Sequence, residues 1–141
     1  MNVRHIIRLH AAWKRVIVGL EGECALEATL GEPTTVTLPD SFLAGCHADS
    51  VTMSRRFNRP TGLDDGSSVV LDCGLLHCAD WAALNGTSLG PNEGGTADIT
   101  DLLRPHNELE VTISKKRFAA ASVASARLLI VDRECESAPP V

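Results

Sequence analysis

The sequence is poor in aromatic side chains and has no long apolar run. Its 141 residues include three phenylalanines, two tryptophans and no tyrosine. Sugars and nucleobases are often bound by stacking on aromatic rings, so few stacking platforms are available. No stretch is long and apolar enough to span a bilayer, and the apolar run at 16–20 is too short for the core of a signal peptide. We therefore expect a cytoplasmic protein with no membrane partner.

Positive charge and catalytic motifs are also scarce. The chain has 13 lysines and arginines against 18 acidic residues, a formal net charge of −5. An acidic surface repels a phosphate backbone, so we expect no nucleic-acid partner. There is no Ser-His-Asp order, Gly-rich phosphate loop or His-rich metal motif. The residues themselves therefore do not indicate an enzyme.

The cysteines do not form a recognisable framework. Five is an odd number, so they cannot all pair within the chain, and their spacing matches no zinc template. We expect no disulfide, no bound metal and no cofactor, with most thiols buried in strands. Asp64, Asp65 and Asp98 offer oxygen ligands for a structural calcium ion, but no loop has calcium-binding spacing. The cysteines are Cys24, Cys46, Cys73, Cys78 and Cys135.

Short segments of alternating or β-branched apolar residues, separated by turn residues, make up most of the chain. Asn85-Gly86 is a strong signal for a two-residue hairpin, because both residues tolerate positive φ. Helical sequence is limited to a capped turn at 98–103 and a short stretch at 119–126. This pattern predicts an all-β protein, an antiparallel β-sandwich. The expected strands cover 16–20, 35–38, 51–57, 67–73, 79–84, 109–113 and 126–131.

The same alternation predicts a domain boundary and a core. We expect a single domain over residues 1–133 and a flexible C-terminal tail over 134–141, which is charged and ends in prolines. The inward-facing residues of the expected strands should be buried together. They are Val69, Leu71, Leu84, Leu89, Ile99, Leu102, Leu109, Val111 and Ile113.

Several motifs between residues 67 and 113 occur in a fixed order. Together they resemble the galactose-binding-like jelly roll at the N-terminus of glycoside hydrolase family 2 enzymes, such as β-galactosidases and β-glucuronidases. Each motif also has a structural reason, since the asparagines suit turns and Asp98 can cap the turn that follows it. The motifs are Asn85-Gly86 with Gly90 four residues on, Asp98-Ile99-Thr100, and Asn107-x-Leu109-x-Val111.

Two upstream features support the resemblance, and one segment departs from it. Trp13 resembles an early tryptophan of the family, and Arg55-Arg56-Phe57 followed by Pro60 resembles its basic-aromatic strand. In the departing segment, Leu75 stands where the family usually has glycine. Likewise, Ala82 and Ala83 stand where many members have valine and tryptophan.

The resemblance implies a non-catalytic, carbohydrate-binding-like module. Family 2 enzymes carry two catalytic glutamates on a separate barrel domain, which this chain is too short to contain, so we expect a stand-alone domain that is not an enzyme. The candidate ligand-binding residues are Trp81, His77 and Asp80 near the loop at Gly74, with Asn92 and Glu93 in the opposite connection. Two of them have an ordinary alternative, namely sheet packing for Trp81 and a solvated loop for His77.

A structural or protein-docking role without sugar binding is the other reading. The family domain packs against its barrel, so this module would dock onto a protein partner such as a glycosidase. The face that carries Trp81 and Ala83 would make the contact, because a small residue there allows close approach. The scarcity of aromatic residues favours docking, whereas the family resemblance favours a carbohydrate ligand.

Overall fold

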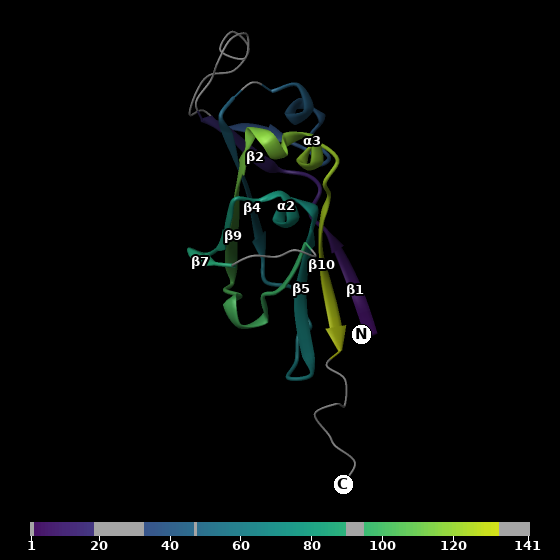
Figure 1. Ribbon diagram of the computed structural model, residues 1–141. Coiled ribbons are helices and arrows are strands. Elements are labelled where there is room, and N and C mark those ends of the chain that lie inside the picture. The colour runs from purple at the N-terminus through teal and green to yellow at the C-terminus, as the bar shows by residue number, and fades with distance from the viewer. Residues whose placement is uncertain (1, 19–32, 47, 90–94, 133–141) are drawn as a thin grey trace.

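Two antiparallel sheets face each other in a computed structural model that describes residues 2–18, 33–46, 48–89 and 95–132 (Figure 1). The four-stranded sheet has the order β1 (Asn2–Arg8), β10 (Ala126–Asp132), β5 (Ser67–Cys73) and β8 (Thr96–Asp98). The six-stranded sheet has the order β3 (Thr34–Val36), β2 (Trp13–Val18), β4 (Ser50–Asn58), β9 (His106–Ser114), β6 (Trp81–Leu84) and β7 (Thr87–Ser88). The predicted all-β sandwich is confirmed.

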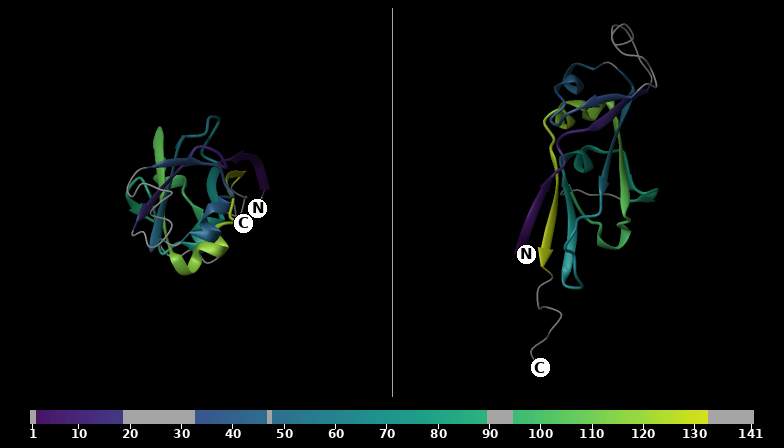
Figure 2. Two further views of the ribbon diagram at one scale, coloured as in Figure 1. Left: turned by 90° about the horizontal axis from the view of Figure 1, so that it is seen from above. Right: turned by 180° about the vertical axis from the view of Figure 1, so that it is seen from behind.

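Helical turns occupy the connections between strands. Two of them, η1 and α3, contact each other and close one end of the sandwich, whereas β1 begins and β10 ends at the other end (Figure 2). The expected helical stretch at 119–126 is confirmed only in its first residues, because β10 begins at Ala126. The turns are η1 (Ser41–Gly45), α2 (Gly74–Cys78), η2 (Thr100–Leu102), η3 (Lys115–Arg117) and α3 (Phe118–Ala121).

The hairpin between β6 and β7 has the predicted two-residue turn. Leu84 pairs with Thr87 across it, so only Asn85 and Gly86 form the loop. Their φ angles are 52° and 84°, the positive values that a type I′ turn requires. This turn geometry matches the right-handed twist of the two strands, which explains why Asn-Gly is favoured here.

Several elements differ from the sequence-based expectation, among them β1, the start of β6 and the orientation of β2. The strand β1 was not predicted, and its alternation is interrupted by a register shift between Val3 and His5. The connection before β6 contains the helix α2, so the strand expected at 79–84 begins at Trp81. In β2 the residues Trp13, Arg15 and Ile17 face the core, whereas Val16 and Val18 face outward. The last two residues of the segment 16–20 and the tail at 134–141 lie outside the described residues.

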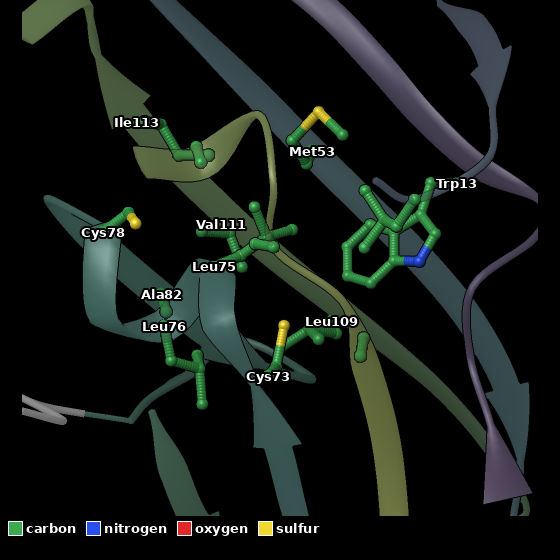
Figure 3. Close-up of a cluster of buried hydrophobic side chains, with 14 of the residues drawn as sticks. Trp13, Met53, Cys73, Leu75, Leu76, Cys78, Ala82, Leu109, Val111 and Ile113 are labelled. Carbon is green, nitrogen blue, oxygen red and sulfur yellow. The ribbon is translucent and has the colours of Figure 1, made fainter. Parts of the chain in front are cut away.

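The core lies between the two sheets. Most of the predicted core residues are fully buried, and only Leu89 and Leu102 are partly buried while packing against the others. Figure 3 shows side chains from β2, β4, α2 and β9 converging on this space. Trp13 is the largest of the fully buried side chains, and its indole Nε1 donates a hydrogen bond to the backbone oxygen of Leu9 at 2.5 Å.

The two asparagines of the motifs form one hydrogen-bond network. The amide nitrogen of Asn85 donates to the backbone oxygen of Leu102 at 3.1 Å and to Oδ1 of Asn107 at 3.0 Å. Its Oδ1 accepts from the backbone nitrogen of Glu108 at 2.9 Å. Asn107 also bonds both backbone polar groups of Arg104, at 2.8 Å each. The network therefore ties the hairpin turn to the start of β9 and the end of η2.

The Asp98-Ile99-Thr100 motif continues the pairing of β8 beside β5. The backbone nitrogen of Ile99 donates to the oxygen of Val69 at 2.9 Å. The hydroxyl of Thr100 then accepts from the nitrogen of Val69 at 2.9 Å and donates to the carboxylate of Asp98 at 2.6 Å. Asp98 also accepts from the backbone nitrogen of Thr100, as predicted for a cap. The motif therefore satisfies the backbone of β5 where β8 ends.

The described cysteines are free thiols. Cys46, Cys73 and Cys78 are buried as expected, but only Cys73 lies in a strand, since Cys46 follows η1 and Cys78 ends α2. Cys24 and Cys135 lie outside the described residues. Burial raises the pKa of the Cys73 thiol to about 12, and burial also raises the pKa of Cys78. Since the thiolate is the reactive form, both thiols should be inert in the folded protein.

We expect the Cys73 thiol to react with DTNB only after unfolding. The unfolded thiol ionises near pH 9, whereas the folded thiol keeps its proton up to about pH 12. The unfolded state therefore loses this proton first, and the free energy of unfolding should fall as the pH rises between these values. Urea titrations at increasing pH should show this loss in the wild type and less of it in Cys73→Ala. Rapid labelling of Cys73 in the native protein would contradict the prediction.

Candidate functional site

Trp81 is an exposed aromatic side chain on the outward face of the six-stranded sheet. It is the first residue of β6 and pairs with Thr112 of β9. Its side chain is 46% exposed, whereas Ala82 and Leu84 belong to the core. Packing in the core therefore does not account for Trp81. Its indole is available to a ligand or a partner.

A row of small and hydroxyl-bearing side chains leads away from Trp81 across the sheet. The strand register places Thr112, Thr52 and Val16 in line with it, on β9, β4 and β2. The hydroxyls of Thr52 and Thr112 lie 3.3 Å apart. We call the outward residues Val16, Thr52, Trp81, Ala83 and Thr112 the Trp81 face. The sequence analysis missed the two threonines, although both alternate with core residues of their strands.

Asp80 lies directly before Trp81 and connects β6 to the end of β9. Its Oδ2 accepts a hydrogen bond from the backbone nitrogen of Ser114 at 2.5 Å, and its Oδ1 lies 3.6 Å from Nε of Arg117. Both side chains of this ion pair are partly exposed. The carboxylate is therefore held in place by the backbone while one oxygen and the guanidinium remain accessible to solvent.

The other predicted residues belong to a different part of the surface. His77 is exposed on α2 and lies beside Gly95, the residue that precedes β8. Asn92 and Glu93 lie outside the described residues. The structure thus brings Asp80 and Trp81 together at the edge of β9. It places His77 next to the end of the connection that contains Asn92 and Glu93.

Two of the three carboxylates considered for calcium, Asp64 and Asp98, have hydrogen-bond partners within their own turns. Asp64 accepts hydrogen bonds from the backbone nitrogen of Gly66 and the hydroxyl of Ser67, both at 2.9 Å. The bond from Ser67 is the main cause that lowers the pKa of Asp64. Asp98 is bonded to Thr100. Over the described ranges, no group of three or more His, Cys, Asp and Glu side chains is arranged to hold a metal ion.

Glycine is required where α2 meets the connection between α3 and β10. A Cβ atom at Gly74 would lie 3.0 Å from the Cβ and 3.3 Å from the Cα of Ala124. The nitrogen of Gly74 donates to the oxygen of Ser125 at 2.9 Å. The close approach explains a glycine at 74, one residue before the position at which the ungapped resemblance expects it.

None of the described helices is long and apolar enough to cross a membrane.

Comparison with known proteins gives structural matches only. No protein-family model matches the sequence. No curated protein matches it either. Among solved structures, an FMN-binding β-glucuronidase from Faecalibacterium prausnitzii L2-6 has 25% identity and a TM-score of 0.64 over 94% of the chain. A β-glucuronidase from Bifidobacterium dentium has 20% identity and a TM-score of 0.66, again over 94%.

The matching region is a minor part of each larger protein. The chain spans 23% and 31% of these two β-glucuronidases, and 24% of a putative β-galactosidase from Bacteroides fragilis, at 15% identity and a TM-score of 0.60. Another match is a β-glucuronidase of glycoside hydrolase family 2, of which the chain spans 18%. The resemblance to a domain of family 2 enzymes is therefore confirmed at the level of the fold.

Proposed function

We propose that the chain is a non-catalytic carbohydrate-binding domain in which Trp81 is the stacking platform. The observation that carries the proposal is the half-exposed indole of Trp81, which follows directly after Asp80, a residue that forms a partly exposed ion pair with Arg117. The apolar C–H face of a sugar ring packs on an indole, and its hydroxyls need hydrogen-bond donors and acceptors around that ring. Asp80, Arg117 and Thr112 supply both kinds of group next to Trp81.

The absence of catalysis is part of this proposal. Glycoside hydrolysis needs two carboxyl groups held across the scissile bond at a defined separation. Asp80 is the carboxylate nearest in sequence to Trp81, and the backbone nitrogen of Ser114 fixes one of its oxygens. Glu110 lies opposite Ala83 on the same outward face of the sheet. An open sheet face does not hold two carboxylates across a sugar bond as a cleft does. We therefore expect the chain to bind a sugar without hydrolysing it.

Docking onto a glycosidase is the second candidate, and the exposed apolar residues on the outward side of the six-stranded sheet support it. Trp81 is 46% exposed there, whereas Ala83 is already covered and could not make the contact. Val18, at the end of β2, is 46% exposed on the same side of the sheet. An exposed indole and an exposed valine on one side of a sheet suit a protein surface as well as a sugar. Under this alternative the partner would be the catalytic part of a family 2 enzyme.

A glycan array with the purified chain should identify bound sugars, and titration calorimetry should then compare variants. Aromatic stacking is worth roughly 0.5–1.5 kcal/mol, so Trp81→Ala should weaken binding by up to about tenfold. Trp81→Phe should keep part of the affinity. Val123→Ala is the matched control, since Val123 is 74% exposed outside the Trp81 face.

Three outcomes would count against the proposal. Sugar binding that is unchanged in Trp81→Ala would place the site elsewhere. No bound glycan, together with capture of a glycosidase that Trp81→Ala abolishes, would favour docking. Turnover of aryl glycosides of galactose, glucose, glucuronic acid or mannose, lost on replacing one carboxylate, would show that the chain is an enzyme.

A further inference from the structure

A cavity of about 510 Å³ lies between the two sheets, away from the Trp81 face. Residues of β1 and β10 line it on one side, and residues of β4 and β9 line it on the other. This volume is within the range of small-molecule pockets. Its floor is apolar, formed by the buried side chains of Leu9, Phe57 and Leu128.

Arg55 contributes a cation to this cavity from the inward-facing row of β4. It alternates with the buried residues Met53 and Phe57, and its own side chain is half-buried. Burial lowers the pKa of its guanidinium. Its Nη1 donates to the backbone oxygen of Arg56, but no carboxylate of the described residues lies within ion-pair distance. A partly desolvated cation without a counter-ion is stabilised when a bound anion supplies the negative charge.

The strand β2, which pairs with β4, carries a comparable arginine on its inward side. Arg15 faces inward from β2, and its Nη1 lies 2.5 Å from Oδ2 of Asp40. The ring of Phe42 covers its guanidinium, with 3.9 Å from Cζ to the ring centroid. The Nε atoms of Arg15 and Arg55 both have no hydrogen-bond partner. The two arginines therefore differ in the counter-ion: among the described residues, Arg15 has one and Arg55 has none.

The remaining polar lining of the cavity is also suited to an anion. Arg8 lines it as well, whereas Arg56 at its rim is exposed and pairs with Glu108 at 3.5 Å, and no Asp or Glu is among the described lining residues. His106 and Asn58 add a polar pair, with 3.0 Å between Nδ1 and Oδ1. Positive charge is thus concentrated where the cavity also offers apolar surface.

We propose that this cavity binds a small organic carboxylate, whose charged group pairs with Arg55 and whose apolar body packs on Phe57 and Leu128. A guanidinium presents donors in a planar fork that matches the two oxygens of a carboxylate. The apolar floor distinguishes such a ligand from a free inorganic anion, which would leave that surface wet. This site is independent of the proposed sugar site, because Trp81 lies on the outward side of the six-stranded sheet.

The test is a calorimetric and NMR titration with benzoate, and with benzamide as a neutral ligand of nearly the same shape. Benzoate should bind and shift the methyl resonances of Leu9 and Leu128, whereas benzamide should bind at least about tenfold more weakly, because the charged hydrogen bonds are lost. Arg55→Gln should weaken benzoate binding by a similar factor. Arg104→Gln, at an exposed arginine that does not line the cavity, and Trp81→Ala should both leave it unchanged.

A stability measurement keeps the proposal falsifiable if Arg55→Gln alters folding. Because no carboxylate of the described residues pairs with Arg55, the ligand-free variant should unfold at a urea midpoint no lower than that of the wild type. A clear decrease would reveal an internal partner for Arg55 and overturn the proposal. Equal affinity for benzoate and benzamide, absence of benzoate binding, or inorganic phosphate binding as tightly as benzoate would overturn it as well.

Discussion

Replacing Asp40 with alanine is expected to lower the free energy of unfolding by about 3–5 kcal/mol, because it leaves Arg15 buried without its counter-ion. The ion pair joins side chains that are each more than nine-tenths buried, at 2.5 Å. It also joins β2 to the start of η1, since Oδ1 of Asp40 accepts from the backbone nitrogen of Phe42. Urea unfolding followed by circular dichroism gives the measurement.

Two further variants separate the ion pair from other effects of the substitution. Asp132→Ala removes an exposed partner of Arg4, 3.3 Å away, and should cost less than about 1 kcal/mol. The double variant Arg15→Met with Asp40→Leu removes both charges and should recover much of the stability, since apolar side chains of similar size often replace buried ion pairs without loss. If Asp40→Ala were as mild as Asp132→Ala, the Arg15–Asp40 pair would be solvated in solution.

Trp13→Ala is expected to cost about 3–5 kcal/mol, the usual range for removing a large aromatic side chain from a core. Trp13 is fully buried between the sheets. Trp13→Phe should cost less, because it keeps part of the ring volume while losing the hydrogen bond to Leu9. Chemical denaturation followed by circular dichroism avoids dependence on the tryptophan signal.

Trp81→Ala is the matched control for this second prediction. Its indole is 46% exposed, so its removal should change the free energy of unfolding far less than Trp13→Ala does. Equal losses at the two positions would mean that Trp81 is buried by a contact on its own face. Trp81→Ala should therefore change the free energy of unfolding little, while it should weaken the binding of a sugar.

The strands that could be predicted from the sequence are those with uninterrupted local patterns. Leu109, Val111 and Ile113 alternate with polar residues, and the Asn85-Gly86 turn is specified by its own two residues. In contrast, the register shift in β1 breaks the alternation between Val3 and His5. The helix α2 is too short to show a helical period.

The orientation of β2 could not be predicted, because a polar residue faces its core side. Arg15 reads as an outward residue until its partner Asp40 is known, and 25 positions separate the two. The even-numbered valines of this strand then appear to be the inward residues. A distant ion pair thus reversed the pattern that alternation alone predicts.

The candidate site, too, could be predicted from the sequence only in part. Trp81 could be selected from the sequence, but the run Trp81-Ala82-Ala83-Leu84 has no alternation that reveals which side faces the core. The asparagines of the motifs were assigned to local turns, whereas Asn85 and Asn107 bond each other across 22 positions. The threonines beside Trp81 become neighbours only through the pairing of β4 and β9.

The register shift in β1 has a consequence for how copies of this chain meet one another. The other edge strands, β3, β8 and β7, have only three, three and two residues, so they expose few unpaired backbone groups. The longer edge strand β1 is interrupted at Arg4, whose guanidinium bonds Ser67 at 2.6 Å and pairs with Asp132. A bulge and a fixed charge at an edge hinder the addition of a strand from another molecule. The described sheets are thereby protected from growing into intermolecular ones.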